Sequence, residues 1–197
     1  MILYEYENGL YVNLTNRCTC ACTFCIRLGH DGVGSADSLW LSRDPSEQEV
    51  LDAFTATDLS QYKEVVFCGY GEPTEALDVL IAAAKYVRSV SDIPIRLNTN
   101  GLGSLSHGKD VPKLLEGLID VMSVSMNAPT AQEYLEVTQP CFGEGAFEAM
   151  LNFVRECKPL FPKVMVTAVD VITEEQAQRC QKLADELGVP FRLRAFS

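Results

Sequence analysis

The sequence lacks the features that would tie it to a membrane or to export. No apolar run in its 197 residues approaches the roughly 20 residues that cross a bilayer. The first ten residues contain no Lys or Arg, and therefore no basic segment of the kind that opens a secretory signal peptide. We expect a cytoplasmic protein with no membrane association.

Basic residues are also scarce. The chain has 16 Lys and Arg against 27 Asp and Glu, a net charge of −11. A surface of that sign repels phosphate backbones, so we expect no non-specific nucleic-acid binding, although a local basic pocket is compatible with it. The length and the 47% of hydrophobic residues suffice for one compact core, which predicts a single domain over residues 1–197.

Histidine is rare, with two residues, whereas cysteine is abundant, with eight. Without a secretory signal, disulfides are the weakest explanation for so many cysteines. Four of them lie within eight positions, too close together for bridges that close long loops: Cys18, Cys20, Cys22 and Cys25. The other four are scattered, and we interpret them as buried or incidental thiols: Cys68, Cys141, Cys157 and Cys180.

Strand and helix patterns alternate along the chain. After a short strand at Met1–Glu5, strands are predicted at Val12–Asn16, Glu64–Cys68, Ile95–Thr99, Val121–Met126, Lys163–Val171 and Pro190–Phe196. Helices are predicted at Glu47–Phe54, Leu77–Val90, Val111–Leu118, Ala146–Lys158 and Glu174–Leu187. Such alternation predicts an α/β fold of parallel strands joined by crossover helices. Residues 29–44, rich in Gly, Asp and Ser, are predicted to form either a lid beside the cysteines or a surface loop without function.

Three predicted strands carry polar side chains on one face only. These side chains are Arg96, Asn98 and Asn100, then Ser123, Ser125 and Asn127, and finally Arg192 and Arg194. A strand between two helix layers should be apolar on both faces, so a barrel interior that holds a polar ligand is favoured over an exposed antiparallel face. Arg194 lies nearer the C-terminal end of its strand, where it could bind an anion or pair with Asp170.

The clustered cysteines form the pattern C-x3-C-x2-C through Cys18, Cys22 and Cys25, with Cys20 spare. Three closely spaced thiolates can bind three irons of a [4Fe–4S] cluster and leave the fourth iron open for another ligand. The alternative is a zinc site, made of three cysteines with His30 or of all four clustered cysteines.

The segment Cys18-x3-Cys22-Thr23-Phe24-Cys25 resembles the signature of the radical S-adenosylmethionine (SAM) superfamily, including an aromatic residue, Phe24, before the third cysteine. The turn Gly69-Tyr70-Gly71-Glu72-Pro73 is similar to the superfamily's GGEP element, with Tyr70 in place of the first glycine. The polar strand ends at Asn98 and at Ser125 to Asn127 are similar to those that contact SAM in relatives. The sequence from Leu14 to Arg27 further resembles that of the small radical SAM proteins associated with TatD-family hydrolases.

The resemblance implies a partial (β/α)6 TIM-like barrel with a [4Fe–4S] cluster and SAM as cofactors. Its cluster ligands would be Cys18, Cys22 and Cys25. Its SAM contacts would be Phe24, Gly69, Tyr70, Gly71, Glu72, Asn98, Ser125, Asn127 and Arg194. The missing Cβ of Gly71 would let SAM approach the backbone.

The implied activity is an oxidoreductase reaction in which reductive cleavage of SAM yields a 5′-deoxyadenosyl radical that abstracts hydrogen from a substrate. A flavodoxin or a ferredoxin would supply the electron, and a TatD-family hydrolase is a possible partner. The sequence identifies neither a catalytic residue beyond the cofactor site nor the substrate, which could be anionic. Two alternatives stay open: an activase of a protein partner, and a zinc-stabilised binding module.

Overall fold

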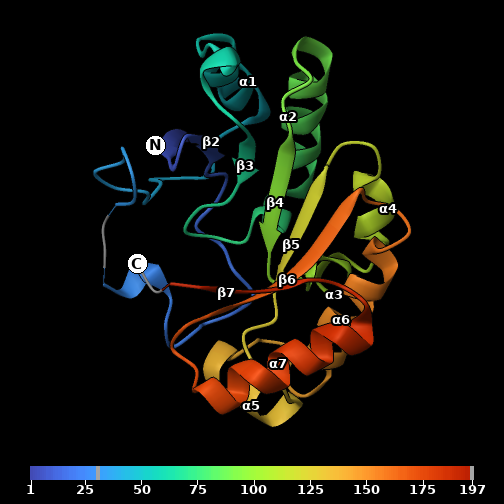
Figure 1. Cartoon of the computed structure of the whole chain (residues 1–197). Helices are drawn as coiled ribbons and strands as arrows, with labels where there is room; N and C mark the ends of the chain where they lie inside the picture. The colour runs from blue at the N-terminus through green and yellow to red at the C-terminus, as the bar shows by residue number, and fades with distance from the viewer. Residues whose placement is uncertain (30–31, 196–197) are drawn as a thin grey trace.

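A computed structural model describes residues 1–29 and 32–195 of the chain (Figure 1). Its seven strands form one sheet in chain order: β1 Leu3–Tyr6, β2 Gly9–Val12, β3 Val65–Phe67, β4 Ile95–Thr99, β5 Val121–Ser125, β6 Lys163–Val169 and β7 Phe191–Arg194. Strands β2 to β7 are parallel, and β1 pairs antiparallel with β2. Within the described residues the sheet stays open, because β1 and β7 are not paired with each other. The partial barrel of six parallel strands is confirmed, with one antiparallel strand added at its edge.

Helices fill the connections between the parallel strands. They are α1 Glu47–Thr55, α2 Leu77–Val90, α3 Gly103–His107, α4 Val111–Leu115, α5 Ala131–Thr138, α6 Gly145–Cys157 and α7 Glu174–Leu187, with short 3-10 turns η1 Ile26–Leu28, η2 Leu59–Gln61 and η3 Pro73–Ala76. Complete capping boxes begin α1, at Ser46 with Glu49, and α7, at Thr173 with Gln176. None of the described helices combines the length and the apolarity that a bilayer crossing requires.

The helices pack against one face of the sheet. Leu97, Met122 and Val124 on the strands share a core with residues of α2, α6 and α7 such as Leu80 and Val154. Cys157 and Cys180 are buried in this core, as the sequence analysis interpreted them. The opposite face of the sheet is therefore free of helices and is the one available to a ligand.

The first parallel strand differs from its prediction. It covers Gly9–Val12 instead of Val12–Asn16, and it is joined to β1 by a two-residue turn at Glu7 and Asn8, both with positive φ. The strand ends before Asn13, whose buried side-chain amide donates to Leu39 O at 2.7 Å and to Met1 O at 3.2 Å. The chain leaves β2 at this point to carry the cysteines.

The segment from Gly32 to Asp44 is docked against the barrel, although most of its residues are exposed, and its predicted role as a lid stays a prediction. Ser35 N donates to Glu5 O at 2.9 Å and Glu5 N donates to Ser35 Oγ at 2.8 Å, so the segment bonds with the edge strand β1. Leu39 is 1% exposed and belongs to an apolar cluster with Tyr4, Tyr11 and Tyr70 inside the sheet's helix-free face. The segment closes one side of that face.

Candidate functional site

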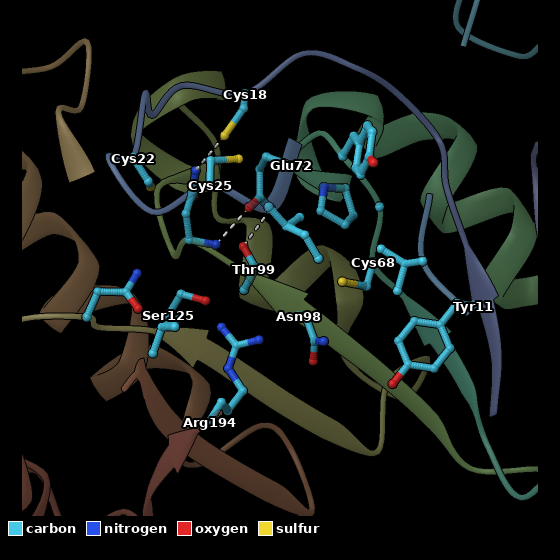
Figure 2. Close-up of a pocket in the computed structure, with 18 of the residues that line it drawn as sticks. Tyr11, Cys18, Cys22, Cys25, Cys68, Glu72, Asn98, Thr99, Ser125 and Arg194 are labelled. Carbon is cyan, nitrogen blue, oxygen red and sulfur yellow. Dashed lines mark hydrogen bonds between the residues drawn. The ribbon is translucent and has the colours of Figure 1, made fainter. Parts of the chain in front are cut away.

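A cavity of about 600 Å³ occupies the helix-free face of the sheet (Figure 2). The predicted polar interior is confirmed, because seven of the eight polar side chains line this cavity: Arg96, Asn98, Asn100, Ser125, Asn127, Arg192 and Arg194. Ser123 is the exception; it is buried and lies outside the lining. Phe24 and the turn from Gly69 to Pro73 complete the predicted set at the same cavity.

The cysteine loop is irregular but held from two sides. On one side it bonds to the end of α5 and the residues after it: Ala21 N donates to Thr138 O at 3.0 Å, Thr23 N to Val137 O at 2.9 Å, and Cys141 N to Thr19 O at 2.9 Å. On the other side, Glu72 N donates to Arg17 O at 2.8 Å. The fold therefore places the cysteines between the Gly-Tyr-Gly-Glu-Pro turn and the C-terminal end of α5.

The four clustered cysteines differ in their surroundings. All four border the cavity, but Cys18, Cys22 and Cys25 are partly exposed, whereas Cys20 is 6% exposed and belongs to the core. The pKa of the Cys18 thiol and that of Cys22 are lowered, chiefly through hydrogen bonding with the Cys20 thiol. Burial raises the pKa of Cys25. Exposure thus separates the same three cysteines from Cys20 as the spacing did.

The three partly exposed thiols at this cavity are a donor set suited to a [4Fe–4S] cluster with one open iron. Among the described residues, no group of three Cys, His, Asp or Glu side chains is arranged around a single metal position. His30, the alternative zinc ligand, lies outside the described residues. The assignment of the cluster to Cys18, Cys22 and Cys25 stays a prediction from spacing and exposure.

The two glycines of the turn lie against atoms of the protein. From the sequence, we expected the missing Cβ of Gly71 to make room for SAM. A Cβ on Gly71 would lie 2.3 Å from Thr15 O and 2.5 Å from Arg17 O, and one on Gly69 would lie 2.1 Å from Asn13 Oδ1. Both glycines therefore let the turn pack directly against the segment that carries the cysteines. Gly71 therefore allows close packing against the cysteine loop. SAM could approach this turn only from the side that faces the cavity.

Tyr70, the residue in place of the first glycine, points away from the turn's glycine neighbours into the apolar cluster on the helix-free face. It is buried, and its ring lies 5.2 Å from that of Trp40 in an edge-to-face arrangement. The side chain thereby links the turn to the docked segment, and the Tyr70 backbone N–H donates to Asn13 Oδ1 at 3.3 Å.

Glu72 is 5% exposed, and protein donors occupy its carboxylate. Oε1 accepts from Thr74 N at 3.1 Å, Thr74 Oγ1 at 2.8 Å and Thr99 Oγ1 at 2.7 Å, and Oε2 accepts from Asn100 N at 2.7 Å. Burial raises the pKa of Glu72, and these donors oppose that rise. The carboxylate joins the turn to the end of β4 through these hydrogen bonds. Its predicted contact with SAM would therefore have to be made by oxygens that already accept hydrogen bonds from the protein.

Sequence reasoning did not predict two sets of polar interactions that organise the site. Asn100 Nδ2 donates to Thr19 Oγ1 at 3.0 Å and lies 4.0 Å from Cys18 Sγ, so it joins β4 to the cysteine loop. Glu64 forms a two-point ion pair with Arg96, at 2.7 and 3.1 Å, and Arg96 also donates to Tyr11 Oη at 3.2 Å. The signal for Asn100 was its place at a polar strand end; nothing local pointed to Glu64 as the partner of Arg96.

Two buried side-chain atoms have no hydrogen-bond partner within the part of the chain that the structure describes: Asn127 Oδ1 and Arg194 Nε. Both residues line the cavity. Asn127 is 5% exposed and follows β5 with a φ of 60°, in the left-handed region that asparagine tolerates. Arg194 forms no ion pair within the described residues, and the alternative pairing with Asp170 is replaced by a backbone bond, Asp170 N to Arg194 O at 2.9 Å.

Solved structures with the same fold come from several bacteria. Streptococcus suis SuiB bound to precursor peptide SuiA has a TM-score of 0.71 and 14% identity, covering 99% of this chain and 40% of SuiB. A radical SAM methyltransferase from Sphaerobacter thermophilus has a TM-score of 0.65 and 14% identity, covering 98% of this chain and 68% of the other. At these identities the similarity establishes the fold, and the chain spans about 40% of the length of SuiB.

A third structure, TsrM from Kitasatospora setae with cobalamin and a [4Fe–4S] cluster bound, has a TM-score of 0.57 and 15% identity, covering 94% of this chain and 34% of TsrM. A search of the curated proteins found no match. The model of the Radical SAM superfamily matches residues 12–186, a span that holds the cysteine loop, the Gly-Tyr-Gly-Glu-Pro turn and strands β3 to β6. The chain therefore belongs to the radical SAM superfamily, whose [4Fe–4S] cluster and S-adenosylmethionine are its cofactors.

Proposed function

We propose that this protein is an enzyme that uses SAM to abstract hydrogen from a substrate, with Cys18, Cys22 and Cys25 as the ligands of its cluster. The cluster supplies the electron that cleaves SAM reductively to methionine and a 5′-deoxyadenosyl radical. The observation that carries the proposal is the convergence of three thiols and the unpartnered Asn127 oxygen on one cavity.

Asn127 is the residue best suited to orient SAM. Its Oδ1 is a buried acceptor to which no described residue donates, and SAM offers donors in its amino group and its ribose hydroxyls. Ser125, two residues before Asn127 on the same strand face, and Asn98 on β4 line the same cavity with hydrogen-bonding side chains. The backbone of Gly69 to Glu72 borders the cavity beside the cysteines and is the proposed site for the methionine end of SAM.

The substrate is proposed to be a small molecule or a modified nucleotide. The polar groups that could contact it lie inside the barrel, on the strand faces, which favours a compact substrate over the protein partner that an activase would need. We expect a flavodoxin or a ferredoxin as the reductant. The TatD-family association and the cytoplasmic location stay predictions from the sequence.

The proposal is tested by anaerobic reconstitution with iron and sulfide, followed by reduction in the presence of SAM. We expect about four irons per chain, the charge-transfer absorption of a [4Fe–4S] cluster, and slow release of 5′-deoxyadenosine and methionine. Serine at Cys18, Cys22 or Cys25 should abolish the absorption, whereas Cys20→Ser, the matched control in the same loop, should retain it. Stoichiometric zinc without an iron–sulfur spectrum would overturn the proposal.

A further inference from the structure

Arg194 is a cation held inside the barrel. Its backbone pairs with Val169 of β6, and its side chain lines the cavity from the C-terminal end of β7. The guanidinium Nε is buried and has no hydrogen-bond partner in the described parts of the chain. Figure 2 shows the side chain pointing into the cavity, toward Ser125 and Asn98 and on the opposite side from the three labelled cysteines.

No acidic side chain of the cavity is free to neutralise Arg194. Three acids line it: Glu64, which is engaged by Arg96; Glu72, which is engaged by Thr74, Thr99 and Asn100; and Glu7. Glu7 lies in the turn between β1 and β2, at the N-terminal end of the parallel strands, whereas Arg194 lies near their C-terminal ends. The other charges at the cavity, on Lys163, Arg192 and Arg96, are positive.

A buried arginine nitrogen without an acceptor is energetically unfavourable for the protein. Arg194 is partly exposed, but its buried Nε is out of reach of water and can regain the lost hydrogen bond only from a partner with a matching acceptor. Burial accordingly lowers the pKa of Arg194. The neighbouring Arg96 shows the usual solution, a two-point pair with a carboxylate of the same protein. Because Arg194 has no such partner among the described residues, a bound anion is the acceptor that suits it.

The position of Arg194 separates it from the turn that is the proposed site for the methionine end of SAM, the end that carries the carboxylate. The cysteine loop and the Gly-Tyr-Gly-Glu-Pro turn are joined to each other and to the ends of β3 and β4. Arg194 lies on β7, three strands beyond β4 in the sheet, and the charged or titratable groups that act on it are Cys68, Arg192, Arg96 and Tyr11. None of these belongs to the cysteine motif.

We propose that Arg194 is the anion-binding residue of the substrate site, so that the substrate carries a carboxylate or a phosphate placed on the β7 side of the cavity. Both groups accept two parallel hydrogen bonds from a guanidinium. This inference rests on the proposed function, because it names the substrate class of the same cavity.

The test uses the reconstituted holoprotein and three variants: Arg194→Gln, Arg194→Lys and the control Arg192→Gln. Arg192 shares the face of β7 with Arg194 and also lines the cavity, but it is exposed to solvent. Thermal unfolding is measured with inorganic phosphate and with malonate, against chloride at equal ionic strength, and SAM binding is titrated separately. Comparing phosphate with malonate shows which kind of anion the site prefers.

We expect an anion at ten times its dissociation constant to raise the melting temperature of the wild type and of Arg192→Gln by about 3–5 °C. This rise should be absent in Arg194→Gln and reduced in Arg194→Lys, which keeps the charge but loses the planar fork. SAM affinity should stay within about twofold of wild type in all three variants.

A loss of SAM affinity of about tenfold or more in Arg194→Gln would make Arg194 a ligand of the SAM carboxylate and overturn the inference. It would also be overturned if the wild type showed no anion-dependent rise, or if Arg194→Gln showed the same rise as wild type. The proposed function fails by a different result, the absence of a cluster or of SAM cleavage in the wild-type protein, so the two failures are distinguishable.

Discussion

The two sides of the cavity contrast in how their polar groups are bonded. On the cysteine side, Glu72, Asn100 and Asn13 make hydrogen bonds within the protein, and these bonds join the turn, β4 and the cysteine loop. On the β5 and β7 side, Asn127 and Arg194 each leave a buried atom without a partner. On the cysteine side the named polar groups are bonded within the protein. On the other side, buried atoms remain that a ligand could bond.

The contrast shows that one side of the barrel is built to hold the cluster and the other to bind ligands. A cluster site must hold three thiols in place, so the surrounding polar groups stabilise the loop, and the sequence meets this need with glycines that allow close backbone packing. A ligand site must exchange protein contacts for ligand contacts, and a polar group satisfied by the protein would gain nothing from the ligand. Buried atoms without partners are therefore expected on the ligand side and damaging on the scaffold side.

Replacing Glu72 should have the largest effect on stability. Glu72→Ala leaves four donors at the turn and at β4 without their acceptor, and each buried unpaired group costs about 1–3 kcal/mol. We expect a loss of at least about 3 kcal/mol in the free energy of unfolding, measured by urea titration, together with lower iron content after reconstitution. Asp78→Ala, an exposed acid in the first turn of α2, is the control and should change stability by about 0.5 kcal/mol. Equal effects of the two changes would contradict the scaffold role of Glu72.

Removing the partner of Arg96 should have an intermediate effect. Glu64→Gln would leave Arg96, whose side chain is 17% exposed, in a state like that of Arg194. Because the Glu64 side chain is 33% exposed and water screens the pair, we expect a loss of about 1–2 kcal/mol rather than the larger loss typical of a fully buried pair. Arg194→Met should be neutral or stabilising in the same assay, since it removes a charge without a protein partner. A large destabilisation by Arg194→Met would show that the described contacts of Arg194 miss an important stabilising interaction.

Replacing Asn127 should have the smallest effect on stability and a clear effect on SAM. Asn127→Gly keeps the left-handed backbone, since glycine adopts a φ of 60° without strain, and removes the unpartnered oxygen. We expect the melting temperature of the cluster-loaded protein to change little, and SAM affinity, measured by equilibrium dialysis, to fall about tenfold. If SAM affinity were unchanged, Asn127 would not be a SAM ligand.

The order of strands and helices could be predicted because its signals are local. Period-two alternation in Arg96–Asn98–Asn100 and the capping boxes at Ser46 and Thr173 depend only on residues close in sequence, and the structure agrees with them. The bounds of β2 were misplaced because they depend on its pairing with β1 and with β3, which lies more than 50 positions away. A local pattern contains no information on such a contact.

The sequence predicted which residues would gather at one cavity, but not how their polar groups are bonded. All the predicted SAM contacts line one cavity, because strand ends of a parallel sheet meet at one edge. The saturation of Glu72 depends on Thr99 and Asn100, and the neighbours of Gly71 are backbone atoms of Thr15 and Arg17. These facts depend on how separate segments pack, so they required the three-dimensional structure.

The central claim is that the three-cysteine site leaves one iron open for SAM. It is tested most directly by the electron paramagnetic resonance spectrum of the reduced, reconstituted protein, recorded with and without SAM. The account predicts a [4Fe–4S] signal whose g-values shift when SAM is added, and no signal in Cys18→Ser. A cluster signal that SAM leaves unchanged at saturating concentration would contradict it.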